Sequence, residues 1–344
     1  MSTVVTAPRP APEEAAAAGP SLLAAIEGDL ARVEQKLLDE TRSEIGAVRE
    51  ISGHTLLAGG KRLRPALALL SARVVGRGEY PAERVVTAAA AAELIHMATL
   101  MHDDVVDAAP ERRGRSTANS VYGNAITILT GDYLLAKSIS LLAYNDDNLH
   151  IVRVFSDVTV TMAEGEVLQA AVAHDRSIPM ATYEDVIERK TSRFLAGCCE
   201  TGGMLGGATL EERDALRAYG NDLGTAFQIV DDLLDFLGDP KKTGKSLGTD
   251  LRDGRVTLPL IHGLAVADAA TRAQLEATLS QTALSDADVA SVTGTLARLG
   301  GFEEAYRVAG ERAERAVAAL ACFPASPWRE TMERLARYVV SRDR

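Results

Sequence analysis

The sequence contains few aromatic residues and few cysteines. Aromatic side chains make up 4% of its 344 residues, and there are three cysteines. Low aromatic content, abundant alanine and short β-branched runs favour helices over strands, so we expect an all-α protein. An odd number of cysteines, with Cys198 and Cys199 adjacent, excludes a fully paired disulfide framework. It favours a reducing compartment, and we expect the protein to be cytoplasmic.

Positive charge is also scarce. The formal net charge of −11 argues against nucleic acid as a partner. No uninterrupted run of about eighteen apolar residues occurs, so no membrane-spanning helix is predicted, and peripheral contact with a bilayer stays open. Residues 1–20 are rich in alanine and proline, without a basic start or an apolar core. We expect a disordered tail there, followed by a single all-helical domain over 21–344.

Two short acidic motifs stand out because each lies within an apolar, helical segment. The first is Asp103-Asp104-Val105-Val106-Asp107. Its spacing places Asp103 and Asp107 on one helical face, where unpaired like charges destabilise a helix. A cation is therefore expected between them, and Mg²⁺ prefers such oxygen ligands.

The second motif repeats this spacing as Asp231-Asp232-Leu233-Leu234-Asp235. A single motif of this type is also compatible with a solvated helix end. Two of them, each followed by basic residues, indicate a site for metal and phosphate. Arginine and lysine are the side chains best suited to phosphate. The basic residues that follow the two motifs are Arg112, Arg113, Lys241, Lys242 and Lys245.

A third basic cluster, Lys61-Arg62-Leu63-Arg64-Pro65, follows Gly59-Gly60 at a predicted helix start. Flexible backbone, free N–H groups and positive charge together suit an anion site, although a basic surface turn is the alternative. His96 shares a helical face with Asp103 and Asp107, so it is a candidate phosphate contact or else a core histidine. His102, turned about 100° from Asp103, is expected to be structural.

These observations together favour diphosphate chemistry. Metal held by carboxylates, with cations around it, can bind a diphosphate and stabilise its charge as it leaves. The sequence has no Gly-x-Gly-x-x-Gly motif, no P-loop and no obvious Ser-His-Asp or Cys-His set. Departure of diphosphate from an allylic carbon in an apolar cavity fits what remains.

Five motifs in this order resemble those of the trans-isoprenyl diphosphate synthases, also called polyprenyl synthetases. They occupy residues 59–65, 102–107 with 112–114, 190–191, 227–235 and 244–250. The resemblance covers roughly residue 22 to the C-terminus. It implies an all-α, isoprenoid synthase-type helical bundle around a central active-site cavity, usually as a homodimer.

The resemblance also implies roles for individual residues. Asp103, Asp107 and Asp231 would ligate Mg²⁺, supported by Asp104, Asp232 and Asp235. The allylic diphosphate would be held by Mg²⁺ together with Arg112, Lys190, Thr191, Gln228 and Lys245. Isopentenyl diphosphate would be held by Lys61, Arg64, His96 and Arg113. The implied reaction is ionisation, head-to-tail attack by the isopentenyl double bond, and loss of a proton to the departing diphosphate.

Two positions bear on how this chain differs within the family. Gly254-Arg255 stands where members commonly have Gly-Lys, and arginine is not a neutral swap for lysine, so a direct role for Arg255 is open. Ala98 and Thr99, on the helix that would line the product tunnel, are small. Bulky aromatics there would plug the tunnel. We therefore predict a long product (roughly C30 to C50), with geranylgeranyl diphosphate (C20) as the alternative.

Three other functions use similar residues. A metal-dependent phosphohydrolase would explain the His102-Asp103 pair, but such sites need several histidines, and only six occur. A terpene cyclase would share the ionisation step, but Lys61, Arg64 and the complete second motif argue against it. A non-catalytic subunit of a heteromeric synthase would tend to lose the acidic motifs, and both are present here.

Overall fold

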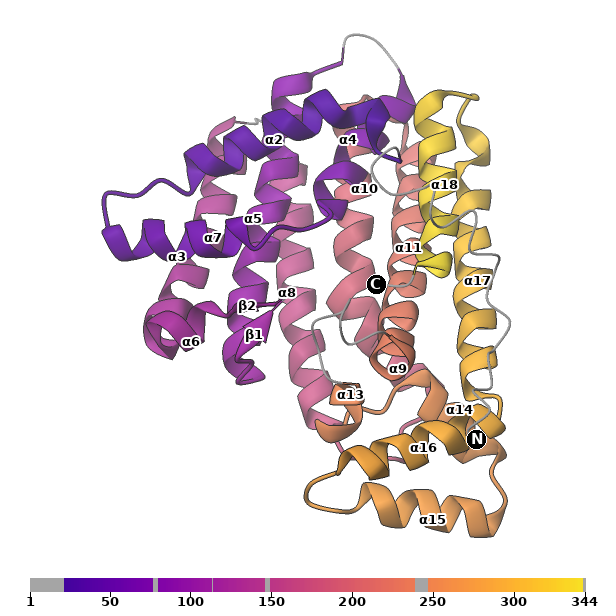
Figure 1. Ribbon diagram of the computed structural model, residues 1–344. Coiled ribbons are helices and arrows are strands. Elements are labelled where there is room, and N and C mark those ends of the chain that lie inside the picture. Colours follow the sequence, from indigo (N-terminus) through magenta and orange to yellow (C-terminus); the bar gives the residue numbers. More distant parts are fainter. Residues whose placement is uncertain (1–21, 77–79, 113, 146–148, 239–246, 343–344) are drawn as a thin grey trace.

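The computed structural model is a bundle of long helices (Figure 1). It describes residues 22–76, 80–112, 114–145, 149–238 and 247–342. Within these ranges the strand content is one antiparallel hairpin of two residues per strand. The prediction of an all-α fold is confirmed. The tail predicted at 1–20 lies outside the described residues, and the single domain over 21–344 stays a prediction.

The helices follow one another with short connections. The first half contains a 3₁₀ turn Ala24–Ile26, α2 Glu27–Glu40, α3 Gly46–Leu57, α4 Leu63–Val75, α5 Ala82–Val106, strands β1 Glu111–Arg112 and β2 Arg115–Ser116, α6 Ala118–Tyr122, α7 Asn124–Asn145 and α8 Leu149–Ala171. The second half contains α9 Met180–Ile187, a π-helix Glu188–Ser192, α10 Arg193–Leu205, α11 Leu210–Leu237, α13 Thr249–Arg252, α14 Leu258–Val266, α15 Ala269–Leu279, α16 Asp286–Arg298, α17 Gly301–Ala319, a 3₁₀ turn Leu320–Cys322 and α18 Pro327–Ser341.

Helices α5 and α11 lie in the interior of the bundle and carry the two acidic motifs near their C-terminal ends. Helix α5 packs against α7 and α4, while α11 packs against α10 and α17 (Figure 1). Most of α5 is buried, including an unbroken run from residue 85 to 95. A helix that is apolar on all sides belongs in a core. Its alanines allow neighbouring helices to approach closely.

Two helices, α5 and α7, are long and apolar enough to cross a membrane. The prediction that no helix spans a membrane rested on the absence of an uninterrupted apolar run in the sequence. Isolated polar residues interrupt both helices, but the average hydropathy over each window stays high. The apolar window of α5 is 78% buried in the bundle, so a protein core accounts for it. The window of α7 is 39% buried, which leaves an exposed apolar face.

Helix α11 connects two hydrophobic cores. Its first part contributes Leu216, Tyr219, Leu223 and Ala226 to the core shared with α4, α5 and α10. Its last part contributes Ile229, Val230, Leu233, Leu234 and Phe236 to a second core with α14, α16 and α17. The second acidic motif is therefore fixed on a helix that is anchored at both ends.

The cluster Gly202, Gly203, Gly206 and Gly207 predicts that a helix loosens or ends there. Helix α10 does end at Leu205, with Gly206 as its C-cap, but Gly202 and Gly203 lie inside the helix. A Cβ atom on Gly202 would lie 2.2 Å from the backbone carbonyl oxygen of Ala68 in α4. The glycine is required by this close approach of two helix backbones. The sequence pattern of Thr209 with Glu212 predicts a capping box at a helix start, and the structure confirms it for α11. The similar pattern of Thr182 with Asp185 predicts a second one, which is wrong because α9 already begins at Met180.

We predict that Gly202→Ala destabilises the protein by about 2–3 kcal/mol, because the added methyl group forces α4 and α10 apart. Gly310→Ala in α17 is the matched control. A Cβ atom there meets nothing within 4 Å, so the change should stabilise the helix by about 0.5–1 kcal/mol. Thermal or denaturant unfolding of both variants measures the difference, and equal effects would contradict this account of α4–α10 packing.

Candidate active site

The first acidic motif is fixed by the way the chain turns after α5. The helix ends at Val106, and Ala108 adopts a left-handed conformation with φ of 48°. The β1–β2 hairpin then folds back over the helix end. This brings Arg112 Nε within 2.7 Å of Oδ1 of the buried Asp104. Arg112 therefore neutralises Asp104, while Arg113 lies outside the described residues.

Asp103 lies in surroundings that disfavour its ionised form. Burial raises its pKa from 3.8 to about 7, and the negative charge of Glu166 acts in the same direction. Lys190 and Arg112 lower the pKa by a smaller amount, while Asp107 raises it further. A carboxylate in this position has too little positive charge around it.

Lys190 and Thr191 lie in the π-helix 188–192, between α9 and α10. Such an insertion widens one helical turn and is frequent at functional sites. Lys190 Nζ donates to Gln169 and lies 2.8 Å from Glu166 Oε1, both on α8. Thr191 Oγ1 donates to Gln228 Oε1 of α11 at 2.8 Å. The π-helix thus connects α8, next to Asp103, with the second acidic motif.

Asp232 is the buried member of the second motif. It accepts hydrogen bonds from Gln228 Nε2 at 2.9 Å and from the hydroxyl of Tyr183 at 2.6 Å. Burial, followed by the charge of Asp250, raises the pKa of Asp232 to about 8 despite these hydrogen bonds. Burial and the charge of Asp232 also raise the pKa of Tyr183, so its hydroxyl stays protonated as the donor.

Asp235 holds the start of the short helix α13. Its two carboxylate oxygens accept from the backbone N–H groups of Thr249 and Asp250, each at 3.1 Å. This caps the short helix α13 and places Asp250 close to Asp232. Lys245 lies outside the described residues.

Arg255 joins the two halves of the site. Its Nη2 atom donates to Asp107 Oδ1 at 2.8 Å, and its Nη1 atom lies 3.4 Å from Asp250 Oδ1. Burial acts to lower the pKa of Arg255, but the charges of Asp250, Asp107 and Asp253 outweigh burial and raise it. The position left open by the sequence is therefore a direct electrostatic link between the end of α5 and α13.

Asp231 is 54% exposed at its side chain and pairs with Arg342 at 3.2 Å. The Arg342 guanidinium lies over the ring of Phe227 at 3.9 Å and donates to the Phe227 carbonyl. Its side chain is only 4% exposed. A residue near the C-terminus therefore neutralises a candidate metal ligand on α11.

The basic cluster before α4 separates into structural and candidate binding residues. Arg62 pairs with Glu34 and with the buried Glu93, at 2.9 Å from the latter. Arg64 lies over the ring of Phe194 at 4.9 Å, and Lys61 Nζ lies 5.9 Å from the ring of Tyr338. Arg62 thus anchors the turn from which Lys61 and Arg64 project.

The two histidines of α5, His96 and His102, have different surroundings. His102 Nε2 donates to the carbonyl oxygen of Ile128 in α7 and lies 3.3 Å from Asp132 Oδ1, and these contacts are structural. His96 is half-buried on the same helix, four residues before Leu100. Its role toward phosphate stays a prediction.

The donor chemistry of the site fits a divalent cation. In the described part of the chain, no three Asp, Glu, His or Cys side chains are arranged to hold one metal ion in this conformation. The carboxylates are paired with arginines of the chain instead: Asp104 with Arg112, Asp107 with Arg255 and Asp231 with Arg342. Carboxylate oxygens are the ligands of Mg²⁺ and Ca²⁺, and such a cation would stabilise the ionised form of Asp103, which burial and the charge of Glu166 disfavour.

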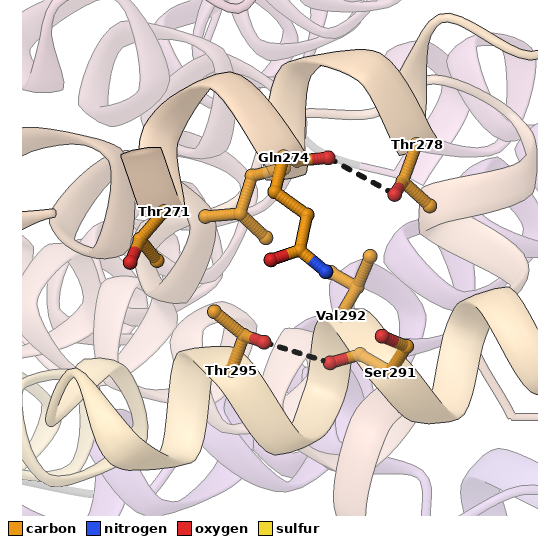
Figure 2. Close-up of a pocket in the computed structure, with 7 residues that line it drawn as sticks. Thr271, Gln274, Thr278, Ser291, Val292 and Thr295 are labelled. Atoms are coloured by element: carbon orange, nitrogen blue, oxygen red, sulfur yellow. Dashed lines mark hydrogen bonds between the residues drawn. The ribbon is translucent and has the colours of Figure 1, made fainter. Parts of the chain in front are cut away.

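A pocket elsewhere in the molecule does not compete with this site. Figure 2 shows that it lies between α15 and α16, where Thr278 donates to the Gln274 carbonyl and Thr295 to that of Ser291. Its lining side chains are all uncharged. A diphosphate needs cationic partners, so this pocket is no candidate for it. The predicted central cavity stays a prediction.

Sequence reasoning missed four residues of the site or gave them no role. Glu166 and Gln169 are polar residues three positions apart on α8, and this spacing, which places them on one helical face, was the available signal. Tyr183 precedes Lys190 by two helical turns, a weaker signal. Arg342 gave none, because its partner Asp231 is remote in the sequence.

Comparisons with known proteins agree on the family of the chain. The family model described as polyprenyl synthetase matches residues 46–296. The octaprenyl diphosphate synthase of Escherichia coli (strain K12) is 38% identical over 92% of this chain and 96% of its own length. A crystal structure of a decaprenyl diphosphate synthase from Rhodobacter capsulatus is 38% identical, with a TM-score of 0.87 over 94% of this chain and 98% of that one.

A second structure bears on ligands. The polyprenyl synthase from Caulobacter crescentus CB15, complexed with calcium and isoprenyl diphosphate, has a TM-score of 0.87 and 34% identity. It covers 98% of this chain and 100% of its own.

We predict that Asp103→Asn stabilises the metal-free protein at alkaline pH. The pKa of Asp103 is raised to about 7, so the folded state holds this proton more tightly than the unfolded chain. The resulting stability is present below about pH 4 and is lost as pH rises to 7, up to about 4 kcal/mol. The amide does not titrate. In chelator-treated protein at pH 8 the variant should melt several degrees higher, and the gap should shrink toward pH 4. If the melting temperatures of the wild type and the variant changed in parallel with pH, ionised Asp103 would not destabilise the fold.

Proposed function

The chain belongs to the polyprenyl synthetase family, and we propose that it condenses an allylic diphosphate with isopentenyl diphosphate, head to tail, as a long-chain trans-prenyltransferase. The observation that carries this function is the approach of both acidic motifs to the π-helix 188–192. Lys190 of this segment lowers the pKa of Asp103 in the first motif. Thr191 donates to Gln228, which in turn donates to Asp232 of the second motif. Cations and carboxylates thus surround a position suited to a diphosphate.

The product is a long prenyl chain. The similar proteins named above are octaprenyl and decaprenyl diphosphate synthases, which supports a length of roughly C30 to C50 over the C20 alternative. Ala98 is buried on α5, one turn before Asp103, and Thr99 beside it is half-buried. Small side chains there leave room for a growing chain.

We assign Mg²⁺ to Asp103, Asp107 and Asp231. The similar structure with calcium and isoprenyl diphosphate supports a divalent cation at this kind of site. When bound, the cation would neutralise the diphosphate and stabilise its charge as a leaving group. The carboxylates of Asp104, Asp232 and Asp235 support the site. Asp104 is held by Arg112, Asp232 by Tyr183 and Gln228, and Asp235 by the first two backbone N–H groups of α13.

The remaining residues bind and orient the two substrates. Lys190, Thr191, Gln228, Arg112 and Lys245 are assigned to the allylic diphosphate, and Lys61, Arg64, His96 and Arg113 to isopentenyl diphosphate. Fixed cations that face a developing negative charge lower the barrier because they need no reorganisation. Ionisation of the allylic substrate is followed by attack of the isopentenyl double bond. The departing diphosphate then takes the proton.

We also propose a homodimer formed through α7. Its first turns expose three apolar side chains: Ile126, Ile128 and Leu129, which are 45%, 39% and 66% exposed. Such a patch marks a contact with another protein more often than bare solvent. We further propose peripheral membrane contact for product release.

The proposed location is the cytoplasm. This location is supported by Cys198, Cys199 and Cys322, which are all free thiols.

Purified protein with Mg²⁺, farnesyl diphosphate and excess isopentenyl diphosphate should give products longer than C20 on reversed-phase chromatography. The reason is the small side chain of Ala98 at the predicted tunnel wall. A sole C20 product would refute the long-chain assignment, and free phosphate without isopentenyl diphosphate would indicate a phosphohydrolase.

Ala98→Phe is the paired variant and should shorten the product. Because Ala98 is 1% exposed, its melting temperature must be measured alongside. An unchanged product distribution in a folded variant would mean that the growing chain does not pass α5 at this point.

Leu129→Glu should convert the proposed dimer to a monomer, because a charge would be buried in an apolar contact. Light scattering after size-exclusion chromatography measures the mass. Val266→Glu is the control, because Val266 is also exposed (52%) but lies at the end of α14. A monomeric wild type, or a dimer in both variants, would exclude this interface.

A further inference from the structure

Helix α8 presents a short polar strip to the π-helix that carries Lys190. Gly165 allows the approach, since a Cβ atom there would lie 2.8 Å from Arg189 Cβ and 3.0 Å from Lys190 N. Glu166 and Gln169, on either side of one helical turn, both contact Lys190 Nζ. The backbone contact and the two side-chain contacts together fix where the ammonium lies.

Stability alone does not explain Glu166. Its ion pair with Lys190 is 2.8 Å long, but the Glu166 side chain is 43% exposed, and exposed ion pairs contribute little. Its negative charge also acts unfavourably on Asp103. Glu166 therefore adds little stability and repels Asp103. Its effect on Lys190 is the better explanation for its presence at this position.

We propose that Glu166 and Gln169 are positioning residues that hold the Lys190 ammonium in place for the allylic diphosphate. This inference rests on the proposed function. A lysine ammonium has three N–H donors. The two acceptors on α8 take two of them and direct the third toward a further acceptor. A lysine fixed in this way loses less side-chain freedom when it binds phosphate than a mobile one.

The neighbouring pair on the same helices provides a matched control. Glu164 lies 2.6 Å from Arg189, which also pairs with Asp185 at 2.8 Å. This pair links the same two segments, but neither Glu164 nor Arg189 is assigned to a substrate. Loss of Glu164 therefore tests whether any broken α8 ion pair is sufficient to disturb the site.

The experiment measures binding of farnesyl thiolodiphosphate, an unreactive allylic analogue, by calorimetry with Mg²⁺ present. Glu166→Ala and Gln169→Ala should each raise its Kd about tenfold, the effect of misaligning one charge-assisted hydrogen bond. KM for isopentenyl diphosphate should stay within about twofold. Glu166→Gln keeps an acceptor and should bind within about threefold of wild type, as should the control Glu164→Gln.

A double-mutant cycle with Lys190→Ala separates positioning from a general structural effect. If Glu166 acts through Lys190, Glu166→Ala adds nothing to the loss caused by Lys190→Ala. A further tenfold loss in that background would overturn the proposal. So would equal effects of Glu164→Ala and Glu166→Ala, or a matching rise in KM for isopentenyl diphosphate.

The wild-type enzyme distinguishes this inference from the proposed function. An active wild type with unchanged Glu166→Ala and Gln169→Ala variants would overturn only the positioning role. A wild type that neither binds the analogue nor makes product would overturn the proposed function, and this inference with it.

Discussion

The burial of carboxylates that also lie near other negative charges is the constraint on which the site depends. Asp103 and Asp232 are held in environments that raise the pKa of each, to about 7 and about 8. Asp104, Asp107 and Asp231 each have an arginine partner from a different part of the chain. Arg112 lies in the hairpin after α5, Arg255 between α13 and α14, and Arg342 at the end of α18, so these pairs tie three distant segments to the acidic motifs. The negative charge that the arginines balance here is also what would bind a divalent cation, and the cation in turn would bind a diphosphate.

The scaffold keeps these charges apart and fixed. Helix α11 is anchored in two hydrophobic cores, and α5 is buried along most of its length. Between them the π-helix places Lys190 and Thr191 on different partners, α8 and α11. Groups held on rigid elements need little rearrangement when charge develops in a reaction, which is the main source of electrostatic catalysis.

The fold class and the two motifs could be predicted because they depend on local patterns. Helical spacing placed Asp103 and Asp107 together, and the capping residues Thr209 and Glu212 marked the start of α11. The partners of these groups could not be predicted in the same way. Arg255 meets Asp107, and Arg342 meets Asp231, only because distant helices pack side by side. The close contact at Gly202 and the π-helix likewise depend on packing, which composition and periodicity do not report.

A crystal structure of the protein with Mg²⁺, farnesyl thiolodiphosphate and isopentenyl diphosphate would test the central claim most directly. The account predicts metal density on Asp103, Asp107 and Asp231, with Arg255 and Arg342 no longer paired to Asp107 and Asp231. Metal and diphosphate bound away from these carboxylates, or both arginine pairs intact beside an occupied site, would contradict it.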